Sequence, residues 1–178
     1  SNLRNIFKNK NELFYFEMKL IRCFEKKLLD LFVKNLLFGT THTCIGQECN
    51  SVSFLNAIET NIDIIWSNHR CHGHFISYSG NIIGLMAEIM GKKTGVCGGR
   101  GGSQHLHYKN FYSNGILGGT VPQALGSAFA IKNKKSICIV FIGDGTMGSG
   151  VFYESLNLAS LWNCPIIFVC ENNNIAQT

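Results

Sequence analysis

Apolar residues recur at three- and four-residue intervals in several parts of the chain, which is the spacing of an amphipathic helix. The clearest case runs from residue 12 to residue 38, where Gly39 supplies a stop signal. Its apolar positions are Phe14, Met18, Ile21, Leu28, Leu29, Phe32 and Leu36. Shorter patterns predict helices over residues 48–60, 82–90 and 122–132, a strand over residues 63–67, and a histidine-rich loop over residues 69–74.

The last third of the chain alternates between strand and helix patterns. Residues 136–142 form a continuous apolar run, as expected of a parallel strand that is covered on both faces. Residues 151–162 place apolar side chains on one helical face, and Pro165 opens a second strand over residues 166–170. Strand, helix and strand at this spacing form a βαβ unit, whose right-handed crossover puts both strands in one parallel sheet. We therefore predict the α/β class, with a parallel sheet flanked by helices.

The length of the chain bounds its domain organisation. With 178 residues, it is long enough for one domain with a sizeable core. We predict a single domain, with an N-terminal helical segment over residues 1–40 and an α/β part over residues 41–178. Because the chain stops just beyond the second strand, we expect an incomplete sheet and a missing C-terminal part.

Composition narrows the compartment and the partners. Charged residues make up 15% of the chain, and the net charge of +5 comes from scattered lysines rather than a basic stripe, so nucleic-acid binding is not predicted. The apolar runs are far shorter than the roughly 20 residues of a membrane span. Eight cysteines without a CxxC pair, and no signal-peptide pattern, predict an intracellular, reducing location, either the cytoplasm or the matrix of an organelle.

Polar side chains follow both strands of the βαβ unit. Asp144 comes directly after the first strand, and Asn173 follows the second. Ligands of open α/β sheets bind beyond the carboxyl ends of the strands, and Mg²⁺ prefers oxygen ligands such as these two side chains. Gly145 lets the backbone approach a phosphate, and the amides of Gly145 and Thr146 can donate hydrogen bonds to it. The sequence therefore predicts a site for magnesium and a diphosphate.

Three other interpretations of these motifs are open. The segment from Gly143 to Gly148 also fits the G-x-G-x-x-G pattern of dinucleotide-binding proteins, with Glu171 as the acidic residue, although the Asp144 carboxylate would repel a pyrophosphate. Helix capping and turn formation would explain Asp144 and Asn173 separately. His69, Cys71, His72 and His74 could bind zinc, but their spacing is too tight for a standard tetrahedral site.

Taken together, the motifs resemble the alpha subunits of the thiamine-diphosphate-dependent decarboxylating component of 2-oxo acid dehydrogenase complexes. The resemblance covers almost the whole chain, including the Gly143-Asp144-Gly145 segment and its spacing to Asn173. The other matching segments run from His42 to Glu48, from Arg70 to His74, from Gly101 to His105, and from Gly115 through Pro122 to Gly126. Two departures are His69, where pyruvate dehydrogenases often carry Tyr, and Gln104, which replaces Met.

The resemblance implies roles for individual residues. Asp144 and Asn173 would bind Mg²⁺, with the backbone carbonyl of Ile175 as a third ligand. His69 and Arg70 would bind the cofactor, Arg70 at the diphosphate. The remaining implied roles are those of Gly115 and Leu117, in the segment that cradles the aminopyrimidine ring, and of His42, the candidate catalytic residue facing the substrate. Packing and hydrogen bonding are the simpler interpretation of His42, and for His72 and His74 this interpretation and a catalytic role are both open. Glu48 is predicted to be structural because the activating glutamate of this family comes from the beta subunit.

The resemblance also implies the reaction and the partners. The enzyme would decarboxylate a 2-oxo acid, with pyruvate as the first choice and acetoin or a branched-chain 2-oxo acid as alternatives, and would pass the acyl group to lipoyl on an acyltransferase component. Thiamine diphosphate and Mg²⁺ would be the cofactors, and two alpha and two beta subunits would assemble. Two hypotheses of other classes are a nicotinamide dehydrogenase and a catalytically empty interaction subunit.

Overall fold

The computed structural model of the chain describes residues 7, 9–37 and 39–176. The chain divides into two compact units. The first comprises Ser1–Ile58 and Arg70–Ser103, and the second comprises Glu59–His69 and Gln104–Thr178. The single domain over residues 1–178, with its helical segment over residues 1–40, stays a prediction, and each unit is described by itself.

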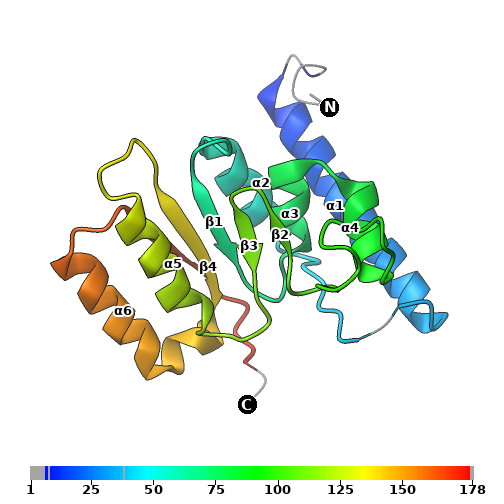
Figure 1. The fold of residues 1–178 in the computed structure, drawn as a ribbon. Coiled ribbons are helices and arrows are strands. Elements are labelled where there is room, and N and C mark those ends of the chain that lie inside the picture. The colour runs from blue at the N-terminus through cyan, green and yellow to red at the C-terminus, as the bar shows by residue number, and fades with distance from the viewer. Residues whose placement is uncertain (1–6, 8, 38, 177–178) are drawn as a thin grey trace. The chain divides into compact units, whose positions relative to one another are not determined.

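Among its described residues, the first unit contains four helices (Figure 1). They are α1 (Lys10–Val33), α2 (Glu48–Ala57), α3 (His72–Ser79) and α4 (Ile82–Ile89). Asn9 is the N-cap of α1, and its side chain accepts a hydrogen bond from the Asn11 amide at 2.9 Å. The buried face of α1 carries Leu13, Ile21, Phe24 and Leu28, together with the carboxylates of Glu17 and Glu25.

The predicted end of the first helix, at Gly39, is wrong. Helix α1 ends at Val33 because Asn35 adopts a left-handed conformation with φ of 54°. The Leu36 amide then donates to the Leu31 carbonyl at 3.0 Å, which closes the helix end in a Schellman-type turn. Asparagine tolerates this conformation better than most residues, so Asn35 was the stop signal, and Phe38 lies outside the described residues.

The histidine-rich segment is not a loop throughout, as the sequence analysis predicted. Cys71 is the N-cap of α3, and His72 and His74 lie inside the helix, where both are buried. Gly80, with φ of 65°, ends the helix. The histidines obscured a helix whose apolar residues, Phe75 and Ile76, are both buried.

The second unit is built on a five-stranded sheet in the order β2-β3-β1-β4-β5 (Figure 1). Strands β1 (Ile64–Ser67), β3 (Phe111–Ser113), β4 (Cys138–Gly143) and β5 (Ile166–Glu171) are parallel, and β2 (His107–Tyr108) pairs with β3 in the antiparallel direction. The predicted α/β class and mostly parallel sheet are confirmed. The β2–β3 hairpin is an addition that the sequence analysis missed.

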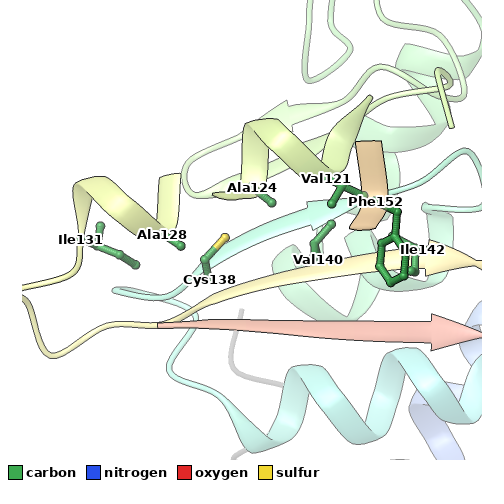
Figure 2. Packing of buried hydrophobic residues seen from close by; sticks show 8 residues of the cluster. All are labelled: Val121, Ala124, Ala128, Ile131, Cys138, Val140, Ile142 and Phe152. Carbon is green, nitrogen blue, oxygen red and sulfur yellow. The ribbon is translucent and has the colours of Figure 1, made fainter. Parts of the chain in front are cut away.

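Helices α5 (Thr120–Ala130) and α6 (Gly150–Leu161) pack against each other, and α5 packs on β4. Figure 2 shows the core between them, where α5 directs its small side chains toward alternate residues of β4. The members of this core are Val121, Ala124, Ala128, Ile131, Cys138, Val140, Ile142 and Phe152. Ile139 and Phe141, on the opposite face of β4, are also buried, which explains why this strand reads as an uninterrupted apolar run.

Buried cysteine behaves here as a small hydrophobic residue. Burial raises the pKa of the Cys138 thiol to about 12, so this thiol stays neutral at physiological pH.

No helix within the described part of the chain combines the length and the apolar character that crossing a membrane requires.

Candidate cofactor-binding site

The strand order of the second unit reverses its direction at β1. Strand β1 lies between β3 and β4, so the chain builds outward from β1 first in one direction and then in the other. Ligands of open α/β sheets bind outside the carboxyl ends of the strands at such a reversal. The residues that follow β1 are Asn68 and His69, and those that follow β4 begin with Asp144. The reversal therefore lies between two segments in which the sequence predicts cofactor-binding residues.

The Asp144 and Asn173 segments follow neighbouring strands and touch each other. Gly143 at the end of β4 is in register with Glu171 at the end of β5. Beyond these strand ends, Gly145 faces Ala176 so closely that a Cβ on Gly145 would lie 3.0 Å from the Ala176 Cβ. Adjacent strands are about 4.8 Å apart, and on this spacing rests the prediction that a single ion contacts side chains just beyond this pair.

A tight turn shapes the asparagine-rich segment after β5. The Asn172 side-chain oxygen accepts from the Asn174 amide at 2.9 Å, and the Asn173 side-chain oxygen accepts from the Ile175 amide at 3.0 Å. Asn174 has φ of 58°, a conformation that asparagine tolerates. Turn formation thus explains part of this run, as the simpler interpretation predicted. An amide oxygen has two lone pairs, so this bond leaves Asn173 with capacity for a cation.

Asp144 does not open directly onto the following α-helix. Residues Asp144–Gly148 form a short 3-10 helix, η2, and α6 begins at Gly150. Gly145 and Thr146 lie in its first turn, where N–H groups have no acceptor within the helix. The Thr146 carbonyl is occupied, since the Ser149 amide and hydroxyl donate to it at 3.1 and 2.9 Å. The predicted amide donors therefore lie at the end of β4, on a segment that Ser149 braces.

The segment of Gly115 and Leu117 follows β3, on the other side of β1. The Asn114 amide donates to the Ser67 carbonyl at 3.3 Å, which joins the ends of β3 and β1. Gly118, with φ of 81°, packs against Ser149, whose Oγ would lie 3.2 Å from a Cβ at this position. The side chain of Gln104 lies against Gly115, and Leu117 is about half exposed. This segment therefore offers apolar surface beside the residues that precede α6.

Glu171, the acidic residue of the dinucleotide interpretation, is buried, and the Asn68 side chain donates to its carboxylate at 3.2 Å. A ribose-binding carboxylate must face the ligand, so this arrangement counts against that interpretation. The sequence analysis missed Asn68, although an asparagine at a strand end was a signal. His69 follows it and is half-buried.

His42 and Arg70 belong to the first unit, where they lie in each other's electrostatic field. The Arg70 guanidinium donates to the Thr43 carbonyl at 2.8 Å. Partial burial, and then the positive charges of Arg70 and His72, lower the pKa of His42 below its usual value. His42 is therefore a neutral imidazole at physiological pH, which can accept or donate a proton.

His72 is engaged in the interior of the first unit. Its Nδ1 lies 3.1 Å from the Glu25 carboxylate, and its Nε2 lies 2.8 Å from the Ser103 hydroxyl. The packing role that the sequence left open therefore describes this residue. Among the described residues, no group of three His, Cys, Asp or Glu side chains could hold a metal ion.

Two further carboxylates organise loops of the first unit. Glu48 binds the Arg22 guanidinium and accepts from the Gly46 amide at 3.1 Å, which agrees with the structural role predicted for it. Glu88, which the sequence analysis missed, is buried in α4 and accepts from the amides of Cys97, Gly99, Gly101 and Gly102. Burial alone would raise the pKa of Glu88, but these four donors together lower it. A single charge in an apolar helix just before a glycine-rich segment was the available signal.

Comparison with known proteins identifies relatives of the chain. The Dehydrogenase E1 component family matches residues 16–178. The alpha subunit of acetoin:2,6-dichlorophenolindophenol oxidoreductase from Bacillus subtilis is 42% identical over 168 residues, which cover 92% of this chain and 50% of that protein. The mitochondrial pyruvate dehydrogenase E1 alpha subunit of Saccharomyces cerevisiae is 40% identical, with 89% of this chain and 38% of that protein covered. For the corresponding subunit of Zymomonas mobilis the identity is 39%, with 92% and 48% covered.

The chain therefore spans half or less of the length of these three relatives. Among solved structures, an enzyme from Mycobacterium smegmatis described as thiamin diphosphate-dependent matches with a TM-score of 0.50 and 15% identity. The match covers 74% of this chain and 21% of that one, and at this identity it concerns the fold alone.

Proposed function

The chain belongs to the dehydrogenase E1 component family, and we propose that it is part of the alpha subunit of a thiamine-diphosphate-dependent enzyme that decarboxylates a 2-oxo acid. One observation carries the proposal. The segments of Gly115 and Leu117, His69, Asp144 and Asn173 follow the carboxyl ends of four adjacent parallel strands, β3, β1, β4 and β5. These are the segments in which the family resemblance expects the cofactor.

The residues present fit a diphosphate and its magnesium ion. The Asp144 carboxylate, the Asn173 amide oxygen and the Ile175 carbonyl are hard oxygen donors of the kind that Mg²⁺ selects. Gly145 lets the segments that follow β4 and β5 approach each other closely, because a side chain at this position would crowd Ala176. Leu117, about half exposed, would pack on the aminopyrimidine ring beside Gly115. His69 and Arg70 would complete the cofactor contacts, Arg70 with its forked guanidinium on phosphate oxygens.

Bound thiamine diphosphate would supply the carbanion and electron-sink chemistry of decarboxylation. The chain's own residues would bind, orient and exchange protons. Asp144 and Asn173 would fix the ion, and the amides of Gly145 and Thr146 would donate to phosphate oxygens. His42, held neutral by burial and by the positive charge of Arg70, would accept or donate a proton at the substrate.

The substrate and partners follow from the same proposal. Pyruvate is the proposed substrate, with acetoin or a branched-chain 2-oxo acid as alternatives, and the acyl group would pass to a lipoyl-bearing acyltransferase. A beta subunit would complete the active site in an assembly of two alpha and two beta subunits, and supply the glutamate that activates the pyrimidine ring. Glu48 is unsuited to that role, because Arg22 and the Gly46 amide occupy its carboxylate. The enzyme would work inside the cell, in the cytoplasm or an organelle matrix.

The decisive experiment is co-expression of the full-length alpha subunit with its candidate beta subunit. Thiamine diphosphate with Mg²⁺ should raise the thermal stability of the complex, whereas NAD should not. The complex should then release CO₂ from one member of a panel of 2-oxo acids. Stabilisation by NAD alone would favour a nicotinamide dehydrogenase. Binding of the beta subunit without cofactor binding would favour a catalytically empty interaction subunit.

A further inference from the structure

A buried carboxylate of the first unit holds two segments that carry predicted active-site residues. Glu25, on the buried face of α1, is fully buried, as is His72 of α3. Both Glu25 oxygens lie close to His72 Nδ1, at 3.1 and 3.2 Å. One of them also accepts from the Cys44 amide at 3.0 Å and from the Cys44 thiol at 3.1 Å. Glu25 therefore joins α1, α3 and the segment between α1 and α2.

The segment that Glu25 holds contains the candidate catalytic residue. His42 lies two positions before Cys44, and between them the Thr43 carbonyl accepts from the Arg70 guanidinium at 2.8 Å. Farther along, the Gly46 amide donates to Glu48, which binds Arg22 of α1. Helix α1 thus fixes this segment at Cys44 and at Gly46, and the segment in turn holds the Arg70 side chain.

The backbone that follows Arg70 is held through the same cluster. The Cys71 thiol donates to the Ser103 carbonyl at 3.3 Å, and His72 Nε2 lies 2.8 Å from the Ser103 hydroxyl. Glu88 fixes the chain just before Ser103 by accepting from the amides of Gly101 and Gly102. The Arg70 guanidinium is therefore connected to Glu25 through Thr43 and Cys44. The Arg70 backbone is connected to Glu25 through Cys71 and His72.

The order carboxylate, imidazole, hydroxyl is also that of a nucleophilic triad, but Glu25, His72 and Ser103 are all buried. A buried hydroxyl cannot meet a substrate, so the cluster acts by position. Burial opposes the charge of Glu25, but the hydrogen bond and charge of His72 and the donors of Cys44 lower its pKa below the usual value. Glu25 is consequently an ionised acceptor, and an amide in its place would put an N–H₂ donor against existing donors.

We propose that Glu25 is a positioning residue, which holds His42 through Cys44 and Arg70 through His72 and Thr43 in the geometry that cofactor and substrate require. The effect on cofactor and substrate binding rests on the proposed function. The contacts by which Glu25 holds Cys44 and His72 do not depend on it.

The test compares Glu25→Gln with Glu17→Gln in the full-length alpha subunit, with and without its beta subunit. Glu17 is the matched control, because it is also buried on α1 and accepts from Asn56 of α2 at 2.7 Å. In the cofactor-free alpha subunit, hydrogen exchange at residues 41–46 should accelerate about tenfold or more in Glu25→Gln, because one neutral oxygen remains to accept from the Cys44 amide, the Cys44 thiol and His72. In the complex, the apparent dissociation constant of Glu25→Gln for thiamine diphosphate should rise about tenfold or more. Both quantities should stay near wild type in Glu17→Gln.

Equal behaviour of the two variants would overturn the proposal, and so would faster exchange with an unchanged cofactor constant. If Glu25→Gln does not fold, Ser103→Ala decides, since it removes only the hydroxyl at the far end of the cluster. It should raise the cofactor constant about threefold or more, and an unchanged constant would overturn the proposal. A wild-type complex that binds no thiamine diphosphate would refute the proposed function, whereas the exchange measurement would still judge the anchor.

Discussion

At the scale of single residues, Asp144 is the most direct test of the magnesium site. Asp144 is half-buried at the end of β4, outside the α5–β4 core. Asp144→Ala should therefore abolish Mg²⁺-dependent binding of thiamine diphosphate to the assembled enzyme and leave the fold intact. Titration calorimetry on the complex measures the affinity, and circular dichroism controls for folding. An unchanged affinity would remove Asp144 from the site.

Arg70 tests the diphosphate contact separately from the substrate pocket. Arg70→Lys keeps the charge but loses the forked geometry, so cofactor binding should weaken by about 1–2 kcal/mol. The apparent constants for cofactor and substrate must be measured separately in the reconstituted enzyme. If only the substrate constant rises, Arg70 belongs to the substrate pocket, and the roles of His42 and His69 change with it.

The lowered pKa of His42 predicts how kcat/KM depends on pH. Because burial and the charges of Arg70 and His72 lower its pKa, His42 loses its proton below the ordinary histidine value of about 6.5. If the reaction needs neutral His42, kcat/KM should stay on its plateau down to a pH below about 6.5 and fall only on further acidification. A pH–rate profile of the complex measures this limb. His42→Ala should lower the plateau and remove the limb, and a limb that survives the substitution would belong to another group.

At the scale of elements, the sequence identified those whose pattern is local. The apolar run from residue 136 to residue 142 and the Pro165-led strand appear as β4 and β5, and the intervening helix appears as α6, each within two residues of the prediction. The end of α1 was missed because it depends on a single residue, Asn35, in a left-handed conformation. Strands β2 and β3 were missed because two- and three-residue strands carry no periodicity, and only pairing defines them.

The residues of the candidate site also differ in whether the local sequence predicts them. Asp144 and Asn173 could be predicted because each follows a strand whose pattern is visible in the sequence. Asn68, Glu25 and Glu88 could not, because their partners lie far away in the chain, as Glu171 does from Asn68. Buried carboxylates look like surface residues in a sequence until their donors are known.

Glu88 of α4 stabilises the glycine-rich segment that follows this helix. Glu88→Gln should destabilise the protein by about 3 kcal/mol, since it removes a charge that four backbone amides share and leaves buried donors without an acceptor. Because the pKa of Glu88 is lowered on folding, its contribution is present above the unfolded pKa near 4.3 and is lost as pH falls through the folded value. Urea unfolding at pH 7 measures the loss. Glu12→Gln, at an exposed position of α1, is the control and should change stability by less than about 0.5 kcal/mol.

At the scale of the whole molecule, the described part of the second unit exposes apolar side chains and the edge of a strand. Large apolar side chains are exposed on α5 and at the C-terminal end of α6. Phe129 and the C-cap residue Trp162 have ring centroids 5.2 Å apart, and Leu161 is 69% exposed. Within the described residues, β5 pairs only with β4, so its outer edge presents backbone groups and the exposed side chain of Ile167. Exposed apolar surface and an uncovered strand edge both favour association.

The last prediction rests on these surfaces and on the proposal that a beta subunit supplies the activating glutamate. The isolated chain should be inactive and should form oligomers or aggregates, because Glu48 is committed to Arg22 and no beta subunit supplies the activating glutamate. Light scattering should show particles larger than the 19.8 kDa monomer, and CO₂ release from pyruvate should not exceed that of thiamine diphosphate alone. Adding the beta subunit to the full-length alpha subunit should yield a defined complex with activity. Decarboxylation of any 2-oxo acid by the purified chain alone, above the cofactor background, would show that the site is complete without a partner and would end the case for a divided active site.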